Sequence, residues 1–390
     1  MATISAAPAV HPRDRLETAA FGGLLAFAAA LQISIAAAGI LLAFSLFCWA
    51  ALVLRNQERP AVPDMFWPLL AYAAATLISC AFSVDPRTSF IASKELVLIL
   101  VVPLVYELAR GSRAMTVMTV VITVGAATAA FGIVQYGLLE YNNLGQRPQG
   151  TLSHYMTYSG LLLLVTCAAA ARLLFEPRDR IWPALMMPAL LAAIMLTLTR
   201  SAWVGTAAGL VLLLALKDVR LLALGPVAAA LIVLAAPSHV ASRFYSMFDP
   251  TDPTNRDRVA MLREGVAMVR THPLTGVGPD MVERVYAIYR VPDAVEKVNP
   301  HLHNVPMQIA AERGLPALAI WIWFIVCATV SIVRVRRRSR YPSLPAAALA
   351  AVAGMLAAGQ FEHNFGDSEF LMLFLVLLTL PLAAERPDHP

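Results

Sequence analysis

Long apolar runs recur along this chain from about residue 21 to about residue 384, and they constrain its fold more than any other feature. The sequence has 390 residues, of which 59% are hydrophobic and only 14% are charged. Soluble domains usually carry about 25% charged residues, and a helix needs roughly 20 apolar residues to cross a bilayer. The pattern therefore predicts an all-α polytopic membrane protein.

We expect about twelve transmembrane helices. They are predicted at about residues 17–34, 36–54, 64–83, 94–109, 114–138, 155–175, 181–199, 201–216, 220–237, 315–333, 343–361 and 367–384. The first two form one apolar run that is too long for a single span, so a tight turn is predicted near Gln32 to Ser34. The run 181–216 is divided at Arg200, because a lone arginine at the bilayer centre costs about 2.5–3.5 kcal/mol.

The distribution of lysine and arginine predicts the orientation of the chain. Most of these residues fall in loops on one side, including the cluster at 334–340, and the short loops of the other side carry only Arg87, Lys94, Arg147 and Arg200. We therefore expect both termini in the cytoplasm. Residues 1–237 are predicted to form the first nine spans, 238–314 a small external helical domain, and 315–390 the last three spans with a cytoplasmic tail.

Three further features limit the class of protein. The polar start of the chain lacks a signal-peptide cleavage site, so the first apolar run is expected to be retained. All four cysteines lie inside apolar runs without metal-binding spacing, which indicates buried thiols. The net charge of +5 comes mostly from loop residues that set topology, so nucleic acid is not an expected partner.

The external segment contains a helix signal of its own. Residues 256–271 are expected to form an amphipathic helix that Thr254 or Asn255 caps. Its apolar face is predicted to carry Val259, Leu262, Val266 and Val269. A second helix is expected at about 280–290, after the turn-rich segment 272–279.

Arginines on the external side are the first candidate site residues. The five singled out are Arg147, Arg200, Arg256, Arg258 and Arg263. Arginine stays charged and binds phosphate oxygens in a bidentate way. Any single one of them has an alternative interpretation as a solvated residue or a lipid-headgroup contact.

Histidines near the re-entry into the membrane form the second candidate group. His301, His303 and Asn304 close the polar segment, and a histidine side chain exchanges a proton near neutral pH. Glu362 and His363 lie in a polar loop between the last two spans, where a plain loop is the alternative. A metal is not expected, because His-x-His supplies two ligands and no nearby cysteine or carboxylate pattern completes a set.

Several short motifs resemble those of the O-antigen ligase/polymerase superfamily in order, spacing and side of the membrane. They are Thr199-Arg-Ser-Ala-Trp203, Arg258-x-x-Met-Leu, His272-Pro-Leu-Thr-Gly-Val-Gly278, and His303-Asn-x-x-x-Gln308 with Glu312-x-Gly-Leu-x-Ala-Leu318. The resemblance implies a metal-independent membrane glycosyltransferase of the GT-C type. Such an enzyme moves a glycan from undecaprenyl diphosphate to an acceptor on the periplasmic face of the bacterial inner membrane.

Within this superfamily a ligase fits best, because the external domain is small. The implied acceptor is the lipid A–core oligosaccharide, which gives lipopolysaccharide. An O-antigen polymerase and an O-linked protein oligosaccharyltransferase share much of the motif set and are alternatives. A transporter of lipid-linked sugars is a further alternative, but it would require charged residues at mid-span on several helices, and few are present.

The resemblance and the residue types together suggest roles. His303 is the expected general base for the acceptor hydroxyl, and attack opposite the leaving group inverts the anomeric centre. Arg200 and one external-helix arginine, Arg258 or its rivals Arg256 and Arg263, are expected to hold the diphosphate, with Arg147 beside them. No cofactor is expected.

Overall fold

The computed structural model describes residues 15–57, 59–223, 225 and 237–387, and every regular element in this part of the chain is a helix. The all-α prediction is therefore confirmed. The elements are α1 (Arg15–Ala30), α2 (Ile35–Asn56), α3 (Phe66–Ala81), α4 (Pro86–Ala92), η1 (Ser93–Leu100), α5 (Val101–Leu108), α6 (Arg113–Gly137), α7 (Tyr155–Phe175), η2 (Pro177–Asp179), α8 (Ile181–Leu196), α9 (Arg200–Lys217), η3 (Val219–Ala223), α11 (Ser238–Tyr245), η4 (Ser246–Phe248), α12 (Pro253–Thr271), α13 (Val282–Tyr289), α14 (Val305–Arg336), α15 (Ser343–Ala358), η5 (Asn364–Gly366) and α16 (Ser368–Ala384).

Among the described residues, 6 helices are long and apolar enough to cross a membrane. They are α2, the continuous segment Pro86–Leu108, α6, α7, α9 and α14, and the shorter apolar helices α3, α8, α15 and α16 accompany them. The chain is thus a multi-pass membrane protein, but the predicted count of twelve spans is not confirmed. Most of the predicted span 220–237 lies outside the described residues. The shorter helices have 16 or 17 residues, and at 1.5 Å per residue they fall short of a hydrocarbon core of about 30 Å.

Two predicted breaks in the apolar runs are confirmed. Residues 31–33 form a turn, and Ser34 then caps α2 by accepting a hydrogen bond from the Ala37 N–H at 3.4 Å. The second break separates α8, which ends at Leu196, from α9, whose first residue is Arg200. This arginine therefore lies at the first position of α9 and not in the middle of a long apolar helix.

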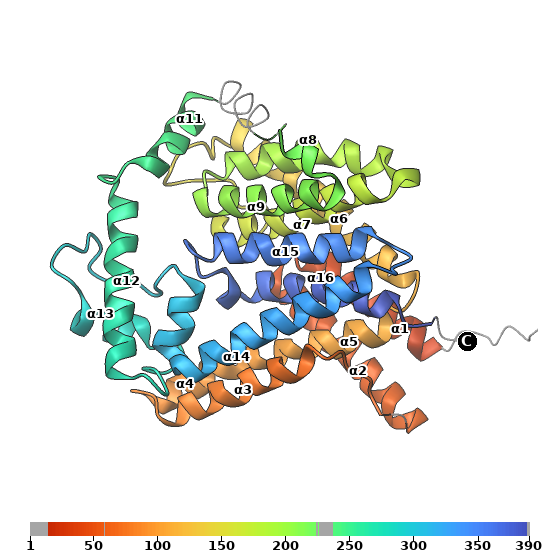
Figure 1. Ribbon diagram of the computed structural model, residues 1–390, viewed down its shortest axis with the longest axis horizontal. Coiled ribbons are helices and arrows are strands. Elements are labelled where there is room, and N and C mark those ends of the chain that lie inside the picture. Colours follow the sequence, from red (N-terminus) through yellow and green to blue (C-terminus); the bar gives the residue numbers. More distant parts are fainter. Residues whose placement is uncertain (1–14, 58, 224, 226–236, 388–390) are drawn as a thin grey trace, which may run out of the picture.

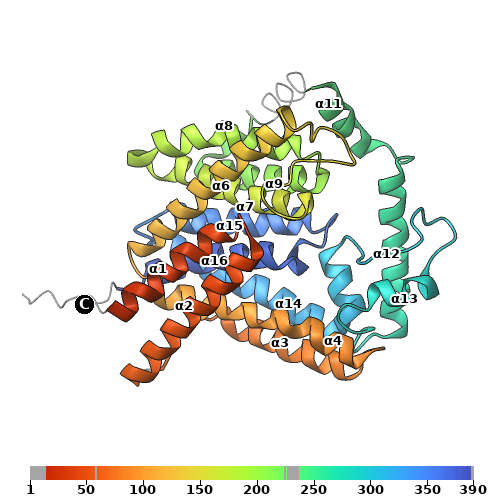
Figure 2. The same ribbon diagram turned by 180° about the vertical axis from the view of Figure 1, so that it is seen from behind.

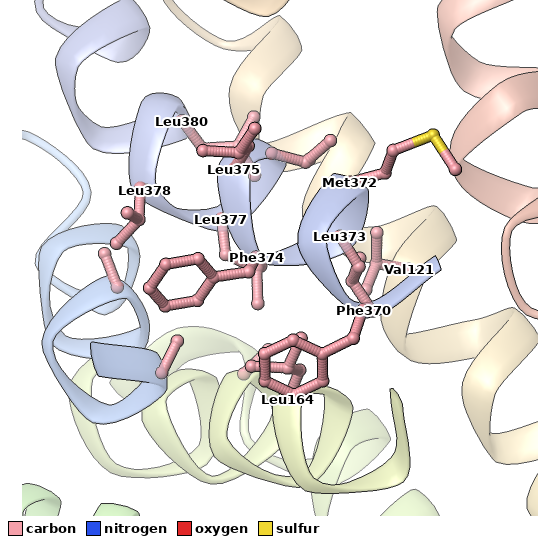
Figure 3. Packing of buried hydrophobic residues seen from close by; sticks show 14 of the residues in the cluster. Val121, Leu164, Phe370, Met372, Leu373, Phe374, Leu375, Leu377, Leu378 and Leu380 are labelled. Carbon is pink, nitrogen blue, oxygen red and sulfur yellow. The ribbon is translucent and has the colours of Figure 1, made fainter. Parts of the chain in front are cut away.

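The long helices lie side by side, and α12 crosses one end of the bundle (Figure 1, Figure 2). The last described residues lie toward the opposite end. A large apolar core joins α7, α15 and α16, and every residue of α16 from Phe370 to Ala384, except Leu371, is buried. Figure 3 shows Phe370 and Phe374 of α16 above Leu164 of α7, and the two rings stack with centroids 6.1 Å apart.

Small residues let the helices that carry the polar end pack closely. A β-carbon at Gly205 of α9 would lie 2.7 Å from the backbone oxygen of Gly354 of α15, and one at Gly209 would lie 2.4 Å from the sulfur of Cys167. Glycines four residues apart allow such close backbone contact between membrane helices. They fix α9, and with it Arg200, against the core.

A kink in α14 anchors the polar segment to the bundle. Gly314 has a φ of 81°, and a β-carbon there would lie 2.2 Å from the Leu274 backbone oxygen. The Gly278 N–H donates to the Glu312 backbone oxygen at 2.9 Å, and the Leu315 N–H donates to that of Pro273 at 2.8 Å. Two of the motifs behind the family resemblance, residues 272–278 and 312–318, are thus bonded to each other, and this contact fixes the start of α14.

The polar segment contains both expected helices, with two corrections. Its long helix, α12, begins at Pro253, and its cap is Asp252 rather than Thr254 or Asn255. The second correction concerns its covered face. Three residues of the predicted apolar stripe are exposed, namely Val259 at 50%, Leu262 at 37% and Val266 at 37%.

A separate small core covers α12 on a different face. It consists of Met261, Met268, Val277, Met281, Val282, Val285, Leu302 and Ala311. These residues come from α12, α13, the connecting loops and the start of α14. Met261 and Met268 of α12 therefore face inward, and of the predicted stripe only Val269 packs against this core.

Candidate functional site

The candidate site lies where several helices begin, at the end of the bundle that α12 crosses (Figure 1). Four caps accept hydrogen bonds from first-turn N–H groups: His154 before α7, Asp252 before α12, Asn304 before α14 and Asp367 before α16. The start of α9 adds Arg200. Helix N-termini carry partial positive charge and free N–H groups, so a place where several converge favours anionic and polar ligands.

Arg200 is almost completely buried and connects the bundle to the polar segment. Its Nη1 donates to the backbone oxygen and the hydroxyl of Ser246 at 3.0 and 3.1 Å. Its Nη2 donates to Asp252 Oδ1 at 3.2 Å, and its side chain is only 4% exposed. The guanidinium therefore holds the Ser246–Asp252 loop while it stands at the site.

Arg243 of α11 also belongs to the site, and the sequence interpretation missed it. Its Nη1 lies 3.8 Å from Asp252 Oδ2, and its buried Nε has no hydrogen-bond partner. Its pKa is lowered to about 10, first by burial and then by the charges of Arg200 and Arg147. A single carboxylate, Asp252, thus faces both the buried Arg200 and the partly buried Arg243, which leaves an excess of positive charge.

Arg258 and Arg147 complete this cationic group. Burial lowers the pKa of Arg258, and the charge of Arg200 adds to the effect while Glu362 opposes it. The Arg258 guanidinium lies 5.9 Å from the Phe361 ring centroid, and its buried Nε is unpartnered. Burial also lowers the pKa of Arg147, which lies 4.2 Å from the Tyr155 ring centroid.

The two other predicted arginines lie elsewhere. Arg256 is exposed, and Arg263 pairs with Asp293 at 2.8 Å on the surface. Of the three external-helix candidates, the structure brings only Arg258 to the site. Arg258 also lies close to the histidines, because it lines the same cavity as His303.

The histidines converge on one buried carboxylate. Glu362 Oε1 lies 3.0 Å from His303 Nδ1 and 3.6 Å from His301 Nε2, and it accepts the His363 N–H at 3.0 Å. Burial alone would raise the pKa of Glu362, but the neighbouring histidines hold it well below its ordinary value. An ionised Glu362 accepts a hydrogen bond from the Nδ1–H of His303, so that Nε2 of this ring is left as the proton acceptor.

His303 occupies a strained backbone position. Its φ is 47°, in the left-handed region that residues other than glycine seldom adopt. Leu198, two residues before Arg200, has a φ of 54°. Such conformations cost about 1–3 kcal/mol and tend to occur at functional sites, where the surrounding structure holds them.

Asn304 and His363, which were also predicted as site residues, lie next to His303 and Glu362 in the chain. Asn304 caps α14, since its Oδ1 accepts the Met307 N–H at 2.9 Å, and its Nδ2 donates to the Gln360 backbone oxygen at 3.1 Å. The pKa of His363 is lowered to about 3, first by burial and then by the charge of His301. His363 is therefore neutral at physiological pH.

The His–Glu group also has the composition of a metal site. His301, His303 and Glu362 offer three ligand atoms that all lie within 4.8 Å of one another. Two imidazoles and a carboxylate form a known ligand set for Zn²⁺. The sequence argument against a metal considered only nearby residues and so missed Glu362, which is 59 residues from His303 along the chain and 3.0 Å from it in space. The expectation that no metal binds stays a prediction.

Three cavities open at the site. The first, about 380 Å³, is lined by Arg258, His303, Asn304 and Phe361, with Leu262 and Phe248 among its apolar walls. The second, about 240 Å³, is lined by His154, Thr157, His301, Glu362 and Asp367. The third, about 510 Å³, lies beside Arg243, Asp252 and His239.

Some of the missed residues carried a recognisable signal. Arg243 is one more arginine in the segment that the sequence predicts to be external, and like the others it departs from the predicted charge bias. Asp252 stands directly before a proline, an arrangement typical of a helix start. His154 gave no such signal, because only the fold brings it near Glu362.

The fold and the site define a multi-pass membrane protein with a buried cationic and imidazole-containing centre at one end of its bundle. Residues 185–322 match the Wzy_C family model, described as O-antigen ligase, and this region contains Arg200, Arg258 and His303. The match supports an O-antigen ligase family assignment for this part of the chain and confirms the predicted resemblance. No curated protein matches the chain.

Proposed function

We propose that this protein is an O-antigen ligase, which transfers a glycan from undecaprenyl diphosphate to the lipid A–core oligosaccharide at the periplasmic face of the bacterial inner membrane. The proposal rests on one observation above all. A His303–Glu362 pair, 3.0 Å apart, stands beside a group of arginines that has more positive charge than its carboxylates neutralise. A proton acceptor next to an anion site is what transfer from a diphosphate requires.

In the proposed reaction, His303 Nε2 takes the proton of the acceptor hydroxyl. The hydroxyl oxygen attacks the anomeric carbon of the donor, and the bond from this carbon to the diphosphate oxygen breaks. Undecaprenyl diphosphate leaves with the electron pair, and attack from the opposite side inverts the anomeric centre. Glu362 stabilises the imidazolium that forms on His303.

The arginines act on the leaving group. Negative charge grows on the diphosphate as the bond breaks, and Arg200, Arg243 and Arg258 face that charge from three different elements. Interactions that strengthen in the transition state accelerate a reaction, whereas uniform binding does not. Bidentate guanidinium groups thereby supply the electrostatic stabilisation that a divalent cation gives in many transferases.

The arrangement of charge along the bundle supports the proposed orientation. The site and α12 occupy one end, whereas Arg334 and Arg336 lie in the last turn of α14, which runs away from that end (Figure 1). Arginine-rich loops remain in the cytoplasm. The end with the site is then periplasmic, and α12 lies along the membrane surface.

The interior favours a one-sided enzyme over a transporter of lipid-linked sugars. Among the buried residues of α16 the only polar side chain is Thr379, and its hydroxyl donates to the Leu375 backbone oxygen at 2.7 Å. A transport pathway would need polar groups at several depths. The buried charged residues of the site, Arg200 and Glu362, instead lie at the start of α9 and in the loop before α16.

The test is transfer by the purified protein from a defined undecaprenyl-diphosphate glycan. Lipid A–core, a second repeat unit and a pilin-like peptide serve as alternative acceptors for ligase, polymerase and protein glycosylation. We expect product with lipid A–core, loss of product in His303→Ala and Arg258→Ala, and normal activity in Arg263→Ala. Product with the repeat unit alone would make the protein a polymerase, and product with the peptide alone would make it a protein glycosyltransferase.

A further inference from the structure

Two of the cavities each reach one ring of the imidazole pair. His303 lines the 380 Å³ cavity, which we call the arginine cavity, and His301 lines the 240 Å³ cavity, which we call the carboxylate cavity. The two rings are 4.4 Å apart between centroids. Ligands in the two cavities would therefore meet at the His301–His303 pair.

The two cavities differ in charge. Arg258 lines the arginine cavity, whereas the described residues that line the carboxylate cavity include no lysine or arginine and two carboxylates, Glu362 and Asp367. Like charges repel strongly in such partly buried surroundings. A diphosphate therefore fits the first cavity and not the second.

The carboxylate cavity has unused hydrogen-bonding capacity. Glu362 Oε2, His363 Nδ1 and Asn364 Oδ1 belong to residues that line it, and these buried atoms have no hydrogen-bond partner. Buried polar atoms in native proteins are nearly always paired, so these three call for a ligand or water. Two of them accept hydrogen bonds, and His363 Nδ1 accepts or donates according to the tautomer.

An aromatic wall and a fixed carboxylate complete the cavity. Phe370 lines it, and the ring is held by close contact with Gly160, where a β-carbon would lie 2.9 Å from the ring. Asp367 accepts hydrogen bonds from the Thr157 hydroxyl and from the Phe370 N–H, the latter at 3.1 Å. Burial raises the pKa of Asp367, and the hydrogen bond from Thr157 opposes this effect.

We propose that the carboxylate cavity binds the acceptor, as a single neutral sugar ring whose attacking hydroxyl points at the His301–His303 pair. This inference rests on the proposed function and adds the location and chemical class of its second substrate. Carboxylates and amides accept hydrogen bonds from sugar hydroxyls, and the Phe370 ring offers an apolar surface for the C–H face of the ring. The volume admits one ring, so the remainder of the acceptor extends outside.

The reaction then takes place between the cavities. The donor diphosphate lies with Arg258 in the arginine cavity, and the acceptor hydroxyl reaches the anomeric carbon past His301. His303 receives the proton at the boundary. Donor and acceptor thus contact different residues, so substitutions in one cavity should affect the binding of only one substrate.

Kinetics of Asp367→Asn and Thr157→Val test this assignment. Asparagine keeps the shape and the capping ability of Asp367, and valine keeps the shape of Thr157. We expect the KM for lipid A–core to rise about tenfold or more in each variant, with the donor KM unchanged. Donor binding measured without acceptor should equal that of the wild type, which a merely structural defect would not allow.

Controls and a charged acceptor sharpen the test. Arg258→Lys should show the reverse pattern, a raised donor KM with an unchanged acceptor KM, and Arg263→Ala should change neither. An acceptor whose terminal ring carries a phosphate should bind poorly to the wild type. If both cavity variants leave the acceptor KM unchanged while the wild type transfers normally, the inference is wrong and the proposed function stands. If the folded wild type transfers nothing, the proposed function itself fails.

Discussion

The replacement Glu362→Gln tests how the site activates its base. It preserves the shape of the side chain but removes the charge that faces His303 at 3.0 Å. The carboxylate is 9% exposed, so water compensates little. A hydrogen bond to a charged group contributes about 1.5–3 kcal/mol. If this stabilisation is realised only when His303 becomes an imidazolium, kcat should fall roughly 10-fold to 150-fold.

Single-turnover transfer with saturating donor and acceptor measures this effect, because product release then does not contribute. Both KM values should change little. The matched control is Glu264→Gln, which alters another buried carboxylate. Glu264 accepts a hydrogen bond of 3.0 Å from the Val291 N–H and does not belong to the site. We expect its folded fraction to retain wild-type kcat. A Glu362→Gln variant within twofold of the wild type would refute the reasoning about the pair.

Four further predictions concern other parts of the structure. Arg243→Ala should raise the donor KM about tenfold or more, because its buried guanidinium lacks sufficient negative partners. Gly314→Ala should lower thermal stability in detergent by more than about 1 kcal/mol, since the position needs a φ of 81° and has no room for a β-carbon. Chelators should leave transfer unchanged, whereas excess Zn²⁺ should inhibit it by occupying the His301–His303–Glu362 set, and His301→Ala should weaken that inhibition. The depressed pKa of Glu362 implies stability that is present above about pH 4.3 and is lost as the pH falls through the folded-state pKa, a loss that Glu362→Gln should not show in acid unfolding.

Much of the bundle follows from local sequence. The apolar runs predict α2, α6 and α7 because each is long enough to show its hydropathy directly. The break before Arg200 follows from the cost of a buried charge. The predicted number of spans stays unconfirmed, because apolar runs that look long enough in the sequence contain helices of only 16 residues next to apolar turn residues.

The covered face of α12 could not be read from its periodicity. Both its valine stripe and its methionine face are apolar, and the choice between them depends on α13 and the start of α14, which pack against Met261 and Met268. Local patterns carry no information on such a choice. The exposed valine stripe instead lines the arginine cavity through Val259.

The site was predictable in its chemistry but not in its connections. Residue types and the family resemblance together pointed to His303, Arg200 and one external-helix arginine, Arg258 or its rivals Arg256 and Arg263. The links between them come from residues far apart in the chain: Asp252 reaches Arg200, and Glu362 reaches His303. Pairings of this kind depend on the packing of whole helices, so a single sequence does not reveal them.

Glycan transfer by the reconstituted protein tests the central claim most directly. Purified wild-type protein in liposomes receives an undecaprenyl-diphosphate glycan and lipid A–core, and the extended lipid is quantified beside a folded His303→Ala variant. We predict product from the wild type and none above background from the variant. A folded wild-type protein without product, or equal product from both, would contradict the account.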